Sequence, residues 1–263
     1  MKDFIYSYPV KVYFGENAAA KALPAGLEGT GKTVMLAYGS GSIKQNGIYN
    51  EICGYLEEAG KEIVDFPGIM PNPTYKKVKE GAALAKEKGV SFILAVGGGS
   101  VIDCCKIIAA QAVIDKDIWE MEFKDHIYPE NYLPMGAVVT ASGTGAEMNN
   151  GAVITNEDTK QKAGVLGAYA SFAVLDPGYT MTVPARQVIS GAFDTLSHCM
   201  ETYLGSPRDI NLSDEIGLPS AFTEMGITDR SVLKKTADTC NITAGCCKKL
   251  DRKEILEILE ECF

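Results

Sequence analysis

The chain has 263 residues, and 46% of them are hydrophobic, which is enough to bury one large or two modest cores. Its formal net charge is −9, which argues against nucleic acid and anionic membrane as main partners, since both select basic surfaces. The sequence begins without an apolar leader, and no stretch approaches the ~20 apolar residues of a membrane helix, so we expect a cytoplasmic protein. The eight cysteines contain no CxxC pair, which favours reduced thiols over a zinc knuckle or a disulfide framework.

Strand-like apolar runs and helix-like periodic stretches alternate up to about residue 180. Continuous apolar runs are typical of strands buried on both faces of a parallel sheet, so we predict an α/β domain with a mostly parallel sheet. We expect strands at residues 9–14, 33–38, 63–66, 91–96, 135–140, 151–155, 161–165 and 172–175. Thr74 should cap a helix that runs to about Lys88, and the polar segment 113–133, which contains His126, should be a surface excursion.

Three of these strands are followed at once by loops of small residues. The loops are Gly39–Lys44 (GSGSIK), Gly97–Ser100 (GGGS) and Ala141–Asn149 (ASGTGAEMN). Because parallel strands end at the same edge of a sheet, the loops should converge where open α/β sheets bind their ligands. The backbone N–H groups of a glycine-rich turn before a helix suit a phosphate group. One such turn is weak evidence, since many strand-to-helix turns with two glycines bind nothing.

Every patterned stretch after residue 182 is helical. We expect Thr182 to cap the first of these helices and Pro184 to begin it. This change of character predicts two domains, an α/β dinucleotide-binding domain of residues 1–182 and an all-helical metal-binding domain of residues 183–263.

The first of these helices carries a candidate metal site. Asp194 and His198 stand four residues apart, so both side chains leave the same helix face and can hold one divalent metal. Taken alone, this spacing more often marks an ordinary hydrogen-bonded pair. These two ligands make half a site, and no histidine follows His198 that could complete it with a further imidazole.

Five motifs, read together, resemble the iron-containing (group III) alcohol dehydrogenases, and within them the butanol dehydrogenase and broad-range aldehyde reductase branch. The motifs are PNPT at 71–74, GGGSVID at 97–103, TASGTGAE at 140–147, LDP at 175–177 and DTLSH at 194–198. The resemblance implies a dehydroquinate synthase-like fold, with a Rossmann-like α/β domain followed by an all-α domain. It also implies hydride transfer between NAD(P)(H) and a primary alcohol or aldehyde such as butanol or butanal, assisted by Fe²⁺ or Zn²⁺, in a homodimer.

The resemblance assigns roles to residues of the loops and of the helix. It implies that the GGGS loop cradles the cofactor pyrophosphate, that Lys162 reaches the nicotinamide ribose, and that Asp194 and His198 are metal ligands. The cofactor-binding residues that it implies are Gly39, Gly41, Ser42, Asn72, Gly97, Gly98, Gly99, Ser100, Asp103, Thr140, Ser142, Thr144 and Lys162. Asp103 would order the pyrophosphate loop from the start of the following helix.

The preference between cofactors depends on residues near the first loop. No carboxylate lies in GSGS, where it would repel a 2′-phosphate, and Lys44 could neutralise one, so NADP(H) is favoured over NAD(H). Asp65 is the opposing signal, because an acidic residue at the end of the second strand binds the ribose hydroxyls of NAD in an ordinary Rossmann fold.

Compared with that family, on the order of a hundred residues of central helices are missing between Ile216 and Gly217. Either the sequence omits a segment that the molecule has, or the protein is a true deletion and a catalytically inactive nucleotide-binding remnant. A lyase resembling dehydroquinate synthase is a third reading, although the lysines and arginines that would bind its substrate phosphate are not evident. The edge strand at residues 9–14 is the expected dimer contact.

Overall fold

The computed structural model describes residues 8–203, 223, 228–239 and 251–261. The chain divides into two compact units, residues 1–195 and 196–263, which we describe separately. The domain boundary predicted between residues 182 and 183 stays a prediction.

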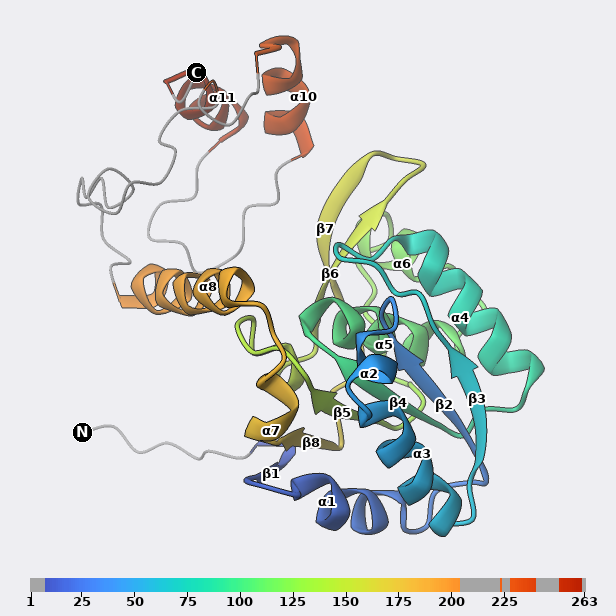
Figure 1. Ribbon diagram of the computed structural model, residues 1–263. Coiled ribbons are helices and arrows are strands. Elements are labelled where there is room, and N and C mark those ends of the chain that lie inside the picture. The colour runs from blue at the N-terminus through green and yellow to red at the C-terminus, as the bar shows by residue number, and fades with distance from the viewer. Residues whose placement is uncertain (1–7, 204–222, 224–227, 240–250, 262–263) are drawn as a thin grey trace, which may run out of the picture. The chain divides into compact units, whose positions relative to one another are not determined.

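The first unit is built on a six-stranded sheet in which every pair of neighbouring strands is parallel (Figure 1). In spatial order its strands are β1 (Lys11–Phe14), β8 (Phe172–Leu175), β5 (Met135–Val139), β4 (Phe92–Gly97), β2 (Thr33–Tyr38) and β3 (Glu62–Phe66). The predicted parallel sheet is confirmed. Its first strand pairs with its last, with Lys11 opposite Phe172.

Helices cover both faces of the sheet. Because side chains alternate along a strand, Val34 and Leu36 of β2 pack into one apolar cluster, and Met35 and Ala37 pack into another. The first cluster also receives α1 (Ala18–Leu27) and α3 (Ile48–Glu58), and the second receives α4 (Tyr75–Glu87) and α5 (Gly99–Gln111). Thr74 caps α4 as predicted, since its hydroxyl accepts a hydrogen bond from Lys77 N at 3.2 Å.

The remaining elements of the first unit surround the carboxyl edge of the sheet or extend beyond it. They are α2 (Ser42–Gln45), α6 (Ile118–Phe123), a 3₁₀ turn (Ala146–Met148), the hairpin of β6 (Gly151–Asn156) and β7 (Gln161–Leu166), α7 (Pro177–Thr180) and the part of α8 (Ala185–Tyr203) up to residue 195. The hairpin is antiparallel and forms a sheet of its own, joined to the loop before α4 where Thr155 N donates to Pro73 O at 2.9 Å.

Two predictions for connecting segments were wrong. The segment 113–133 is only partly a surface excursion, because Ile118 and Trp119 of α6 are buried; His126 is exposed as expected. Thr182 does not cap α8, which begins after Pro184; its hydroxyl is hydrogen-bonded to the Asn46 side-chain amide at 3.2 Å.

In the second unit, α10 (Ser231–Thr239) packs against α11 (Arg252–Glu261). Arg252 Nη1 donates to the Ala237 carbonyl at 2.8 Å, and the side chains of Leu233 and Ile255 are buried. The predicted gap between residues 216 and 217 lies outside the described residues.

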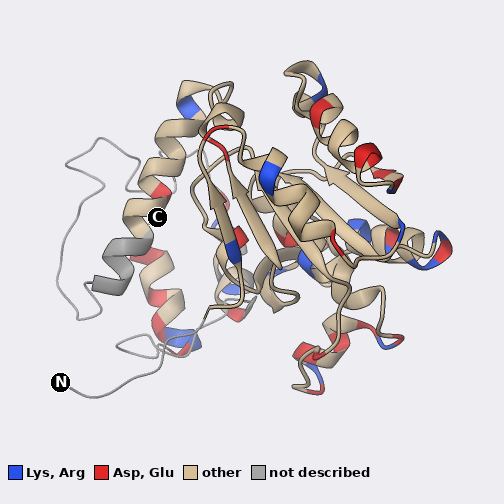
Figure 2. Cartoon of the chain, turned by 90° about the horizontal axis from the view of Figure 1, so that it is seen from below, with Lys and Arg blue, Asp and Glu red and all other residues tan. Residues whose placement is uncertain are grey.

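Two surface properties bear on partners. Acidic and basic residues are interspersed along the outer helices and loops of the described part of the chain in the view of Figure 2. None of the helices described in residues 8–203, 228–239 and 251–261 is both long and apolar enough to cross a bilayer.

Candidate cofactor site

The carboxyl ends of β2, β4 and β5 meet at a pocket of about 350 Å³. The three strands are neighbours in the sheet, so the loops that follow them necessarily emerge side by side. Seven of the predicted cofactor residues line this pocket: Gly39, Ser42, Gly97, Gly98, Gly99, Ser100 and Thr140. The predicted convergence of the first two loops with the start of the third is therefore observed.

The GGGS loop forms a cradle in which side chains would not fit. A Cβ atom at Gly97 would lie 2.5 Å from Val101 Cγ2, and one at Gly99 would lie 2.4 Å from Thr144 Oγ1. Gly98 is the N-cap of α5, a helix of 13 residues, so the unpaired N–H groups of its first turn face the pocket edge. These amides and the positive end of the helix dipole suit an anionic group such as a pyrophosphate.

The loop after β2 owes its shape to a glycine with positive φ. Gly41 has φ +116° and precedes α2, which begins at Ser42. It does not line the pocket, but the turn at this position directs Ser42 into it, and a residue with a side chain would be strained there. Gly39 is held from the other side, because its carbonyl accepts from Gly68 N at 3.0 Å.

The other predicted cofactor residues lie around the pocket rather than in its lining. Lys162 Nζ, on β7, donates to Asn72 Oδ1 at 2.7 Å. Asp103 Oδ2 accepts from Val153 N at 2.9 Å, so its carboxylate contacts the hairpin. Thr144 packs against Gly99, as the Cβ distance given above shows.

Ser142, the last of the predicted hydroxyl residues, lines a neighbouring pocket of about 230 Å³, together with Gly191 and Thr195 of α8. The loop and the helix touch here through glycines, since a Cβ atom at Gly191 would lie 2.6 Å from Ser142 O. Thr195 Oγ1 also donates to Gly143 O at 3.2 Å.

This contact brings the candidate metal ligand on α8 close to the loop. A Cβ atom at Gly143 would lie 3.7 Å from Asp194 Oδ2. His198 falls one turn later in the same helix, but its side chain lies outside the described residues. Within the described part of the chain, no three or more His, Cys, Asp or Glu residues are grouped to hold a metal. The described side chains therefore do not by themselves make a metal site.

Sequence reasoning missed several residues that line the cofactor pocket. They come from the connection between α2 and α3, the loop after β3, and the stretch from α7 to the first turn of α8, and include Asn46, Ile69, Pro71, Tyr179, Thr182 and Gln187. The motif PNPT contains Pro71 and the motif LDP precedes Tyr179, but neither shows which side chain turns toward the pocket.

Beside the first loop, Lys44 lies over two aromatic rings. Its Nζ is 4.3 Å from the centroid of the Tyr49 ring and 5.1 Å from that of Tyr38. A hydrogen bond with Tyr38 raises the pKa of Lys44 above its usual value. Tyr49 Oη donates to Asp65 Oδ2 at 2.8 Å, so the carboxylate that could favour NAD already has a partner.

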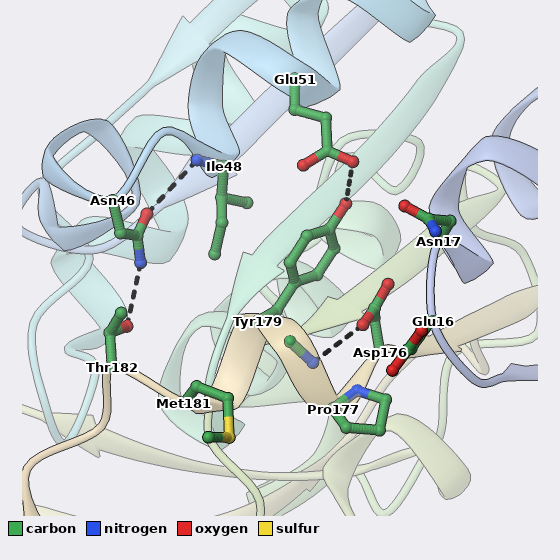
Figure 3. A pocket seen from close by; sticks show the side chains of 11 residues that line it. Glu16, Asn17, Asn46, Ile48, Glu51, Asp176, Pro177, Tyr179, Met181 and Thr182 are labelled. Carbon is green, nitrogen blue, oxygen red and sulfur yellow. Dashed lines mark hydrogen bonds between the residues drawn. The ribbon is translucent and has the colours of Figure 1, made fainter.

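A second pocket, of about 580 Å³, lies next to the cofactor pocket and shares Asn46, Tyr179 and Thr182 with it (Figure 3). Its buried or half-buried carboxylates hold the fold together. Glu51 Oε1 accepts from Tyr179 Oη at 2.7 Å, and Asp176 Oδ1 accepts from Gly178 N at 2.9 Å.

A parallel sheet covered on both faces, with a glycine cradle at its carboxyl edge, defines a Rossmann-like α/β protein. Residues 9–177 match the family model described as iron-containing alcohol dehydrogenase. The chain belongs to this family, as its motifs predicted.

Named relatives agree with this assignment. The chain is 44% identical over 205 residues to the probable NADH-dependent butanol dehydrogenase 1 of Bacillus subtilis, covering 77% of this chain and 52% of the relative. It is 37% identical over 221 residues to the NADPH-dependent aldehyde reductase YqhD of Escherichia coli, covering 81% and 55%. The chain thus spans about half the length of these relatives.

Solved structures support the fold. The NADH-dependent butanol dehydrogenase A of Thermotoga maritima superimposes with a TM-score of 0.72 at 34% identity, over 100% of this chain and 62% of that one. A 1,3-propanediol oxidoreductase superimposes with a TM-score of 0.76 at 19% identity, which bears on the fold alone.

Proposed function

We propose that this chain carries the cofactor-binding part of an NAD(P)(H)-dependent alcohol dehydrogenase or aldehyde reductase acting on primary alcohols and aldehydes such as butanol and butanal. The observation that carries the proposal is the pocket at the ends of β2, β4 and β5, where the GGGS loop and the first turn of α5 line a space that suits an anionic group. The names of the Bacillus subtilis and Escherichia coli relatives support the same chemistry.

In this proposal the bound dinucleotide supplies or accepts the hydride. The chain's own contribution is position: the first-turn amides of α5 hold the pyrophosphate, and the Ser42 and Thr140 hydroxyls donate to its oxygens or to the ribose. The loop after β5 then fixes the distance between the cofactor and α8, because Gly143 and Gly191 are in contact.

The cofactor in this proposal is NADP(H) rather than NAD(H). No acidic residue is among the side chains described in the lining of the pocket, and Asp65 lies outside that lining, hydrogen-bonded to Tyr49, so no carboxylate of the lining repels a 2′-phosphate. Fluorescence titration should give tighter binding of NADPH than of NADH, and Lys44→Met should weaken NADPH binding alone. Lys79→Met is the matched control, since Lys79 lies 5.1 Å over the Tyr75 ring but away from the pocket. Equal affinities for both cofactors would contradict the preference.

The metal half of the proposal depends on Asp194 and His198, with Fe²⁺ or Zn²⁺ as the ion. When bound, such an ion would act as a Lewis acid on the substrate oxygen. Because the described residues form no complete metal site, no catalytic step is assigned through it. Metal analysis of the purified protein tests the proposal directly, and Asp194→Asn should lower the metal content without changing NADPH affinity.

The length of the protein decides between an active enzyme and an inactive remnant. We propose that a segment of central helices belongs between Ile216 and Gly217 in the molecule. The exposure of large apolar side chains on α8 supports this, with Val188 54% and Ile189 57% exposed. An intact mass near 28.2 kDa would contradict it and favour a remnant that binds cofactor without turnover.

A homodimer through β1 is the proposed assembly, in the cytoplasm and without nucleic acid or membrane partners. β1 is an edge strand, and its side chains Val12 and Phe14 are 41% and 77% exposed. Light scattering should give twice the chain mass for the wild type and the chain mass for Phe14→Lys.

Turnover is the test of the whole proposal. Purified protein should oxidise NADPH in the presence of butanal and lose that activity on treatment with a chelator. Full activity in metal-free protein would contradict the metal-dependent mechanism, while cofactor binding without turnover would favour the inactive remnant.

A further inference from the structure

Lys106 is the only lysine that is fully buried in the part of the chain that the structure describes. It lies on α5, two turns after the glycine cradle that opens this helix. Burial lowers the pKa of Lys106 to about 8, with the Asp103 carboxylate opposing the shift. A buried ammonium group persists only where hydrogen bonds compensate for the lost solvation, so its partners show what it does.

The partners of Lys106 lie on the segment between the loop after β5 and the hairpin. Its Nζ donates to Gly151 O at 2.7 Å and to Asn149 Oδ1 at 2.9 Å, and it lies 3.6 Å from Asp103 Oδ1. Asp103, one turn earlier on α5, accepts from Val153 N. Two charged side chains of the same helix therefore hold one continuous stretch of chain.

Asn149 extends this connection into the loop. While its Oδ1 accepts from Lys106, its Nδ2 donates to Gly145 O at 3.2 Å. Both ends of the amide are used, so its orientation is fixed. Gly145 has φ +62° and closes the loop that carries Ser142, Gly143 and Thr144.

The loop held in this way touches both halves of the candidate site. Thr144 packs on Gly99 of the cradle, and the Gly143 carbonyl accepts from Thr195 Oγ1 on α8. A displacement of this loop would change the width of the cradle and the distance from the cradle to α8 at the same time.

We propose that Lys106 and Asn149 are positioning residues, which hold the loop 141–145 against the glycine cradle at the spacing that a dinucleotide pyrophosphate requires. The inference rests on the proposed cofactor binding. If the loop is not held in advance, its backbone must be ordered when the cofactor binds. Ordering a single residue costs enough to weaken binding about tenfold.

Two variants test the connection at different points. Lys106→Met keeps the apolar stem but leaves Asn149 Oδ1 and Gly151 O without their donor. Asn149→Asp keeps an acceptor for the buried Lys106 ammonium group but cannot donate to Gly145 O. This variant therefore removes the hydrogen bond that holds the loop while the buried charge keeps its partner. Ile108→Val is the control, because Ile108 is buried on the same helix and faces Gly81 on α4 rather than the loop.

Three measurements on the full chain decide the matter: the Kd of NADPH by fluorescence titration, amide hydrogen exchange of residues 143–149, and the midpoint of thermal unfolding. Both test variants should bind NADPH about tenfold more weakly and exchange these amides faster, whereas Ile108→Val should lower the midpoint and leave the other two unchanged. Wild-type Kd and exchange rates in Asn149→Asp would overturn the inference, even if Lys106→Met does not fold.

The exchange measurement also separates this inference from the proposed function. If the wild type binds no dinucleotide, the proposed function fails. Unchanged exchange in Asn149→Asp would then overturn the positioning role, and faster exchange confined to the loop would support it.

Discussion

Gly191→Ala should destabilise the protein, although it places a better helix former in the interior of α8. In an open helix this substitution stabilises by about 1 kcal/mol. At Gly191, however, the new Cβ atom would lie 2.6 Å from the Ser142 carbonyl oxygen. Carbon–oxygen contacts between chain segments normally lie at about 3.3–3.6 Å, so the loop or the helix must move by roughly 0.7 Å. Overpacking of this kind costs about 1–3 kcal/mol, and a backbone oxygen cannot rotate away.

The net expectation is a loss of up to about 2 kcal/mol in the free energy of unfolding, with weaker cofactor binding because the Ser142 loop is displaced. Gly54→Ala is the matched control: Gly54 lies inside α3, and a Cβ atom there meets nothing within 4 Å. This control should gain about 0.5–1 kcal/mol. Denaturant unfolding and NADPH titration of both variants measure the two effects. If Gly191→Ala gained stability as Gly54→Ala does, with an unchanged Kd, α8 would not pack on this loop.

Two further substitutions test the cradle and the pH dependence of stability. Gly99→Ala should weaken NADPH binding at least tenfold, equivalent to about 1.4 kcal/mol, because its Cβ atom forces Thr144 out of place; titration beside Gly54→Ala checks this. Burial raises the pKa of Glu122 from 4.5 to about 7, so its stabilising contribution is complete below pH 4.5 and disappears as the pH rises through 7. Glu122→Gln should therefore be more stable than wild type at pH 8, by up to roughly 3 kcal/mol, and nearly equal at pH 4, as urea unfolding at both values would reveal.

The strands of the main sheet could be predicted because buried parallel strands are continuous apolar runs. β2 has the predicted bounds, Thr33–Tyr38. The hairpin of β6 and β7 was recognised as two strands but not as a separate antiparallel pair. The short connection between Asn156 and Gln161 was the available signal, because a parallel pair needs a crossover of a dozen residues or more. α1 was not predicted, since its sequence contains Pro24, which argues against a helix interior, and its buried face consists largely of alanine.

The residues of the candidate site also fall into those that the sequence predicts and those that it does not. Glycine loops that directly follow strands could be placed, because sheet geometry alone brings them together. Tyr179 and Gln187 could not, because they reach the pocket only through the return of the chain after β8, a long-range contact that no local pattern encodes. The same is true of Lys106, whose burial depends on segments more than 40 positions further along the chain.

The pairing of β1 with β8 also constrains how this protein folds during synthesis. Ala18 N, just after β1, donates to Asp176 Oδ2, just after β8, across 158 positions of sequence. At about 5–20 residues per second, a ribosome needs roughly 8–30 s to make that stretch. Throughout this interval the β1 segment has no partner strand, and the edge of β5 that later pairs with β8 is open from the synthesis of Val139 to that of Phe172. The emerging chain therefore exposes open strand edges while neighbouring nascent chains are close, which makes this interval the most favourable one for chaperone binding and for mispairing between copies.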